Sequence, residues 1–180
     1  KEFSALSVSE KEDLKNNNFE LTKEELEFLY EINDKIYGFG YRKDPRIEKI
    51  KEWRNQEKDI SSIFDCRQEQ VVFIGGSRPR FDDDLNPQDR GYFGDDKIND
   101  ETSVIFGDFI PKSFEAEMPK TLKYIVGNVD FRRCKIKNLE QLKFIGGDVN
   151  FDSSQIEDLG QLEIIRGKAD FRNSKVENLG

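Results

Sequence analysis

The chain has 180 residues, of which 35% are hydrophobic and 37% charged, and its formal net charge is −8. This length is enough for one or two domains with a core of ordinary size. An acidic chain without a basic stripe argues against binding nucleic acid through its phosphates. The lack of an eighteen-residue apolar run argues against a membrane span. The absence of His removes the commonest general base and metal ligand.

Residues 1–67 are predicted to form a small helical domain. Thr22, with Glu25 three residues later, has the spacing of a capping box, and it predicts a helix that ends at Gly38. The inner face of this helix is expected to consist of Leu26, Leu29, Tyr30, Ile36 and Tyr37, widened by Phe28 and Ile32. A shorter helix is expected from Ser9, and a third from Pro45, a favoured first helical residue. The inner side of the third helix is predicted to be Ile47, Ile50 and Trp53.

The stretch "LTKEELEFLYEINDKIYGFGYRKDPRIEKIKEWRN" also resembles a segment of an uncharacterised bacterial protein family whose members can carry repeats further along. The resemblance implies a bacterial origin and no particular activity.

The two cysteines, Cys66 and Cys134, are too few for a disulfide framework and favour a reducing, cytoplasmic location. The first thirty residues are charged throughout, unlike a secretory signal. Because the chain begins with Lys1 rather than Met, a removed leader, and with it secretion or delivery to another cell, stays open. Cys66 has no His to activate it, so a catalytic dyad of the usual kind is impossible, and we expect that the protein is not an enzyme.

Residues 68–101 are predicted to be an acidic, irregular connector. Residues 81–101 hold eight carboxylates against Arg90 and Lys97, but an EF-hand loop would need a glycine where Pro87 or Asp89 stands in the two possible registers. The stretch "VVFIGGSRPR" at residues 71–80 lacks the lysine of a phosphate-binding loop. We therefore expect a solvated loop with no metal ion and no cofactor. A metal-dependent hydrolase that uses the carboxylates of residues 82–101, and an acidic inhibitor or nucleic-acid mimic, stay open as alternative functions.

Three copies of one pattern follow the connector, with "LKYIVGNVDF" at Leu122, "LKFIGGDVNF" at Leu142 and "LEIIRGKADF" at Leu162. A fixed period of twenty residues is typical of a solenoid, in which each unit buries its apolar row against its neighbours. The Val-x-Phe alternation has the period of a half-buried strand. We expect the phenylalanines of the three copies to stack as an inner ladder, formed by Phe131, Phe151 and Phe171.

Residues 149–159, "VNFDSSQIEDL", resemble the leucine-rich repeat, whose pattern is L-x-L-x-x-N/C-x-L-x-x-L. The resemblance covers residues 122–180 and implies short parallel strands, with Cys134, Ser154 and Ser174 where the family has an Asn or Cys. In that family the Asn side chain bonds backbone groups along the stack. Residues 102–121, with Pro111 at a strand position, are predicted to be a degenerate capping unit, and further repeats are expected after Gly180. The fold class is therefore predicted to be α+β: a small helical domain (1–67), the connector (68–101) and a leucine-rich-repeat-like solenoid of 20-residue units (102–180).

The strand residues beside the inward Val and Phe positions are predicted to point to the concave side of the solenoid. They form three columns, which are Asn128, Asp148 and Lys168; Asp130, Asn150 and Asp170; and Arg132, Asp152 and Arg172. In two of these columns oppositely charged residues follow one another, so neighbouring side chains can pair along the stack. Because solenoids present such faces as extended binding surfaces, we predict a protein–protein interaction module with these nine residues as its partner-binding site.

Overall fold

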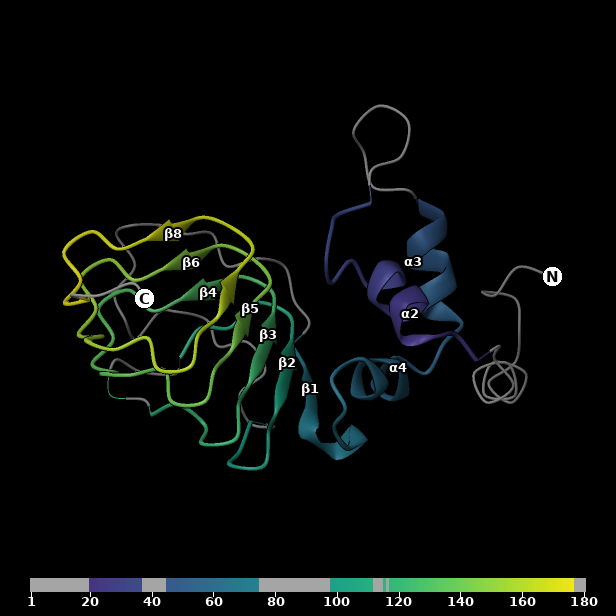
Figure 1. Ribbon diagram of the computed structural model, residues 1–180, viewed down its shortest axis with the longest axis horizontal. Helices are drawn as coiled ribbons and strands as arrows, with labels where there is room; N and C mark the ends of the chain where they lie inside the picture. Colours follow the sequence, from purple (N-terminus) through teal and green to yellow (C-terminus); the bar gives the residue numbers. More distant parts are fainter. Residues whose placement is uncertain (1–19, 37–44, 75–97, 112–114, 116, 177–180) are drawn as a thin grey trace. The chain divides into compact units, whose positions relative to one another are not determined.

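The computed structural model describes residues 20–36, 45–74, 98–111, 115 and 117–176 (Figure 1). The chain divides into two compact units, Lys1–Gln68 and Glu69–Gly180. The predicted α+β class is confirmed, because the first unit is helical and the second stacks parallel strands as a solenoid of roughly twenty residues per turn. The helix predicted from Ser9 and residues 75–97 of the predicted connector lie outside the described residues.

The first described helix, α2 (Lys23–Leu29), has the predicted capping box at its N-terminus. The hydroxyl of Thr22 accepts a hydrogen bond from the N–H of Glu25 at 3.3 Å. In return, the Glu25 carboxylate accepts one from the N–H of Thr22 at 2.8 Å. Leu26 and Leu29 are buried as expected, whereas Phe28 is 64% exposed and does not widen the inner face.

The predicted end of this helix at Gly38 is wrong, because α2 closes after Leu29 in a Schellman motif. The N–H of Glu31 donates to the carbonyl of Phe28, and the N–H of Ile32 donates to the carbonyl of Glu27. Glu31 lies in the left-handed region, at a φ of 55°, where glycine is the usual residue. The sequence therefore holds no glycine signal for this helix end.

The next helix, α3 (Pro45–Glu52), begins at the predicted proline. Of its predicted inner side, Ile47 is half-buried, whereas the other two residues are exposed. Ile50 and Trp53 are 47% and 37% exposed. A helix that the sequence analysis did not predict, α4 (Gln56–Ile63), instead supplies the buried Ile60 and Ile63. Its eight residues hold no further apolar side chain, which is too short a pattern for a helical period to be recognised.

A buried polar network connects the three described helices of this unit. The Asp59 carboxylate of α4 accepts hydrogen bonds from the Tyr30 hydroxyl at 2.9 Å and from Nε and Nη2 of Arg54 at 2.6 and 2.8 Å. The ammonium of Lys51 in α3 lies 5.5 Å from the centroid of the Tyr30 ring. Burial, and then the nearby Asp59 charge, raise the pKa of Tyr30 far above its ordinary value.

Two parallel sheets form the solenoid (Figure 1). The larger sheet has the order β1-β2-β3-β5-β7 and consists of Val71–Phe73, Val104–Phe106, Tyr124–Val126, Phe144–Ile145 and Ile164–Ile165. The smaller sheet has the order β4-β6-β8 and consists of Val129–Asp130, Val149–Asn150 and Ala169–Asp170. Each turn that the three clear repeats form therefore contributes one strand to each sheet.

The pairing register has the period of the sequence repeat. Ile125 pairs with Ile145, and Val129 pairs with Val149. Val104 pairs with Tyr124 and Phe109 with Val129, so these residues of the predicted capping unit continue the same register. The smaller sheet contains the strands that the Val-x-Phe alternation predicts, whereas the larger sheet was not predicted. Its first strand, β1, lies within the range assigned to the irregular connector and pairs in parallel with β2.

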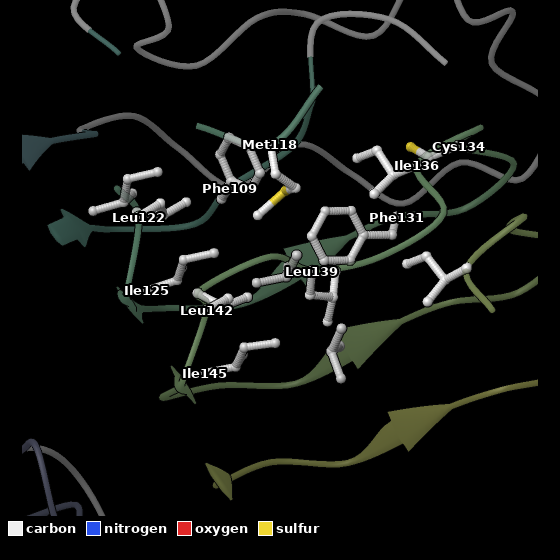
Figure 2. Packing of buried hydrophobic residues seen from close by; sticks show 14 of the residues in the cluster. Phe109, Met118, Leu122, Ile125, Phe131, Cys134, Ile136, Leu139, Leu142 and Ile145 are labelled. Carbon is white, nitrogen blue, oxygen red and sulfur yellow. The ribbon is translucent and has the colours of Figure 1, made fainter. Parts of the chain in front are cut away.

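The core lies between the sheets and continues from turn to turn (Figure 2). The predicted phenylalanine ladder is confirmed: Phe131 and Phe151 stack with ring centroids 5.6 Å apart, and Phe151 and Phe171 with centroids 4.8 Å apart. Phe131 and Phe151 are completely buried. The other labelled core residues come from successive turns and include Met118, Leu122, Ile125, Leu139, Leu142 and Ile145.

One glycine per turn stands where the backbones approach most closely. A Cβ at Gly147 would lie 2.6 Å from the carbonyl oxygen of Gly127 and 2.4 Å from Oδ1 of Asn128. A Cβ at Gly167 would lie 2.4 Å from Oδ1 of Asp148. The glycine of the repeat is therefore required by stacking, because it admits the polar side chain of the preceding turn.

Candidate functional site

The first predicted column forms a hydrogen-bonded ladder along the stack. The N–H of Asn128 donates to Oδ1 of Asp108, the N–H of Asp148 donates to Oδ1 of Asn128, and the N–H of Lys168 donates to Oδ1 of Asp148, each at 2.8 Å. Each Asn or Asp oxygen thus satisfies a backbone donor of the next turn. Lys168 is exposed and carries no side-chain acceptor with which to extend the ladder.

The leucine-rich-repeat resemblance assigns this along-stack bonding to another position. Cys134 and Ser154 are buried at that position, and Oγ of Ser154 has no hydrogen-bond partner. Asp108, Asn128 and Asp148 do the bonding instead. A sequence signal for them exists, because an Asn or Asp follows the repeated glycine in the first two clear copies and in the degenerate unit.

In the second predicted column each side chain stabilises its own turn. Asp130, Asn150 and Asp170 each accept, through Oδ1, the N–H of the residue two positions later, at 3.0, 2.8 and 3.1 Å. This is the Asx turn that Asp and Asn favour. It fixes the backbone that carries the third column.

The third predicted column presents charges of alternating sign at the end of the turns. The Arg132 guanidinium contacts both carboxylate oxygens of Asp130, with Nη2 3.0 Å from Oδ2. Arg172 contacts Asp170 in the same way, with Nη2 2.7 Å from Oδ2, and these hydrogen bonds hold the pKa of Asp170 below its ordinary value. Asp152 stands between the two arginines in the sequence of turns and accepts a hydrogen bond from Nδ2 of Asn173 at 3.1 Å.

The nine predicted residues, hereafter the polar face, differ widely in exposure. Asp130 is only 2% exposed, which corrects the expectation that its whole column points into solvent: its carboxylate turns back to hold Arg132. The Arg132 side chain is 15% exposed and that of Arg172 is 75% exposed. Lys168, Asp148 and Arg172 are the exposed members of the face.

The larger sheet has an outward face that the sequence analysis missed. Ile105, Ile125 and Ile145 point into the core and are completely buried, so the residue before each of them points to the opposite face. The residues on that face are Val71, Val104, Tyr124, Phe144 and Ile164. Three of them are nonetheless buried, which are Val71, Val104 and Phe144; Tyr124 is half-buried and Ile164 is 42% exposed. The signal was present in the repeat, because its third position is apolar in all three copies.

Two searches of the described residues bear on other kinds of function. They contain no group of three or more His, Cys, Asp or Glu side chains placed to hold a metal ion. None of their helices is long and apolar enough to cross a membrane. Most of the carboxylates of the hydrolase alternative, at residues 82–97, lie outside this part of the chain. Comparison with protein-family models, curated proteins and solved structures finds no match for this chain.

Proposed function

We propose that this protein is a bacterial, cytoplasmic interaction module whose leucine-rich-repeat-like solenoid binds a partner protein through the polar face. The resemblance of residues 122–180 to leucine-rich repeats supports the binding role, because solenoids present extended surfaces to partners. The resemblance of the N-terminal segment to bacterial proteins supports the origin.

The observation that carries the proposal is the fixed placement of the third column. Arg132 and Arg172 are each held by the carboxylate two residues earlier, and the Asx turns fix the backbone beneath them. Side chains already held in one rotamer lose less conformational entropy on binding. The face is therefore prepared for a partner whose charges are opposite to those of Asp152, Lys168 and Arg172.

An exchange of charges tests this proposal. The double variant Asp152→Lys/Arg172→Glu leaves the net charge unchanged and reverses the charge at two of the three positions of the third column. We expect it to keep the fold, because substitutions of this kind at the surface usually change stability by no more than about 0.5 kcal/mol. The full chain would be used to capture partners from a lysate of the source organism, and the affinity would then be measured with the purified partner. Like charges placed together across an interface cost several kcal/mol, so the variant should bind at least about tenfold more weakly.

Glu157→Lys/Lys175→Glu is the matched control, because both residues are exposed and the net charge is unchanged. Arg132 is left intact, since an acidic residue there would face the buried Asp130. Equal affinity of the wild type and the column variant for the purified partner would contradict the assignment of the polar face.

A further inference from the structure

β8 is the edge strand of the smaller sheet, whose order is β4-β6-β8 (Figure 1). On its paired side, the carbonyl of Lys168 accepts the N–H of Val149 in β6 at 2.8 Å. Ala169 stands one turn after Val149 in the same register, so its N–H, and that of Phe171 two residues later, point away from β6. Neither N–H has a partner among the described residues. Such an edge is ready to pair with one more strand.

The apolar side chains of this edge are uncovered as well. In the preceding turn, Val149 and Phe151 are 2% and 0% exposed. At the same positions one turn later, Ala169 is exposed and Phe171 is half-buried. A strand that joins β8 would therefore bury apolar surface as well as pair backbone groups, and both contributions favour binding.

Two cations flank these apolar positions. Lys168 and Arg172 stand directly before and after residues 169–171, and both are exposed. Asp170, between them, is already bonded to Arg172 through both of its carboxylate oxygens. The ladder of the first column ends at Lys168, whose side chain offers an ammonium in place of an acceptor. Because oppositely charged neighbours on adjacent strands stabilise their pairing, this edge favours a strand with acidic residues beside both cations.

The chain itself contains a strand of this kind on the other side of β8. Residues 148–152, with the sequence DVNFD, run parallel to residues 168–172, with the sequence KADFR. In this register the two aspartates stand beside the two cations, and apolar residues stand beside apolar residues. The pattern acidic–apolar–polar–apolar–acidic therefore already fits one side of β8.

A second copy of this chain fits the edge poorly. Its own β8 would bring Lys168 and Arg172 again, so two such strands centred on each other set cations beside cations in both strand directions. Like charges placed beside each other on paired strands are destabilising. Residues 148–152 of a second copy are no alternative, because β6 already pairs with β4 and β8.

We infer that β8 receives an extended segment of the partner protein, which joins the smaller sheet as a further strand and has the pattern acidic–apolar–polar–apolar–acidic. Because the pattern has an acidic residue at each end, it matches Lys168 and Arg172 in either strand direction. The inference rests on the proposed function, since both cations belong to the polar face, and it adds the chemistry of the segment that they meet.

Three labelled peptides test the inference by fluorescence anisotropy with the full chain. The first contains the sequence DVNFD, the second has lysine in place of both aspartates, and the third has serine in place of the valine and the phenylalanine. The second meets like charges and the third buries little apolar surface, so the first should bind at least about tenfold more tightly than either.

A variant of the edge separates strand pairing from charge attraction. Ala169→Pro removes an outward N–H of β8 and keeps Lys168 and Arg172, and proline is tolerated on an edge strand where its nitrogen faces solvent. It should weaken the first peptide at least about tenfold, which corresponds to about 1.4 kcal/mol. Ala169→Val, which introduces the residue of the other two copies, is the matched control and should keep the binding.

An exchange of charge tests the two cations. Lys168→Glu/Arg172→Glu should move the preference from the first peptide to the second. Lys120→Glu/Lys137→Glu makes the same change in net charge at two other exposed residues, and the preference should stay with the first peptide. If circular dichroism shows that Ala169→Pro has lost the fold, this exchange of preference is the deciding measurement.

Equal binding of the three peptides, no binding, or unchanged binding by folded Ala169→Pro would overturn the inference. So would self-association of the full chain that Ala169→Pro abolishes, because the occupant would then be a second copy. The purified partner separates this inference from the proposed function: an affinity that falls in Asp152→Lys/Arg172→Glu and not in Ala169→Pro would overturn the added strand and leave the polar face standing.

Discussion

In the helical unit one carboxylate, that of Asp59, holds both Tyr30 and Arg54, whereas in the solenoid each kind of contact recurs on successive turns. The phenylalanine stack and the Asn/Asp ladder each have several members. A change at Asp59 therefore removes the acceptor that Tyr30 and Arg54 share, whereas one change in the solenoid removes one level of a repeated contact. The polar contacts that stabilise the first unit are therefore concentrated at one residue, whereas the contacts that stabilise the second are distributed along the stack.

The largest expected effect comes from breaking the concentrated network. Asp59→Ala leaves the buried Arg54 guanidinium and the Tyr30 hydroxyl without their carboxylate, and removal of one partner from a buried pair costs about 3–5 kcal/mol. Urea unfolding followed by the fluorescence of Trp53, the single tryptophan of the chain, reports on this unit. Asp65→Asn is the control, because the Asp65 side chain is 83% exposed in its pair with Lys23 and Asn tolerates the left-handed backbone of this position, at a φ of 49°; an equal loss in both variants would contradict the concentrated network.

Breaking the distributed core at its centre should also be costly. Phe151 is completely buried and stacks on Phe131 and Phe171, so Phe151→Ala should cost about 3–5 kcal/mol. Hydrogen exchange measured by mass spectrometry should show faster exchange in the strands on both sides and unchanged exchange in α2 and α4. The same substitution at Phe28, which is 64% exposed, should have almost no effect. Protection that is lost only at the turn of Phe151 would mean that the turns unfold independently.

The same contrast explains which features the sequence could predict. Each position of the repeat occurs in three copies, so its residue type is seen three times in the sequence. The register, the Phe ladder and the smaller sheet could therefore be predicted from the period of twenty residues. The larger sheet was missed because its outward residues are also apolar, and an apolar face of a strand does not show the alternation of a half-buried one.

In the helical unit each signal occurs once, and tertiary contacts decide the outcome. Glu31 closes α2 without a glycine, and α4 has only two apolar residues, Ile60 and Ile63. For the polar face, the repeat predicts which residues form each column, but it does not predict the direction in which each side chain points. Asp130 is buried where it pairs with Arg132, whereas the Asp170 side chain, in the same pairing with Arg172, is 30% exposed.

The ladder offers a smaller test of the distributed unit. Asn128→Ala removes the acceptor of the Asp148 N–H, and a hydrogen bond of this kind contributes about 0.5–1.5 kcal/mol to stability. Lys168→Ala in the same column is the control, because no such oxygen is lost, and surface changes of this kind stay within about 0.5 kcal/mol. Thermal melts of the two variants should differ accordingly; equal melting temperatures would show that water replaces the ladder at no cost.

Alkaline pH should act on the concentrated unit through Tyr30. Its pKa in the folded state is raised by burial and by Asp59, so its contribution to stability is complete below the unfolded pKa of about 10 and is lost as pH rises above that value. At pH 11 the loss amounts to about 1.4 kcal/mol. Tyr30→Phe has no proton to lose here, so its stability, although lower at neutral pH, should fall less between pH 9 and 11. Parallel pH profiles of the two proteins would show that the ring is ionised in the fold.

The smallest expected effect comes from removing the N-cap of α2, and it tests whether this cap acts independently of the Asp59 network. Thr22→Ala removes the acceptor of the Glu25 N–H at the start of α2, and loss of an N-cap side chain costs about 1 kcal/mol. The cap lies outside the Asp59 network, so in the double variant Thr22→Ala/Asp59→Ala the two costs should add within about 0.5 kcal/mol.

Asn55→Ala, at the N-cap of α4, removes the acceptor of the Lys58 N–H. Because Asn55 directly follows Arg54 and precedes Asp59 by one turn, this second cap should couple to the network and give a non-additive sum. Equal coupling energies of Thr22 and Asn55 with Asp59 would mean that both caps belong to one cooperative structure. The inference that the stability of this unit is concentrated at Asp59 would then be wrong.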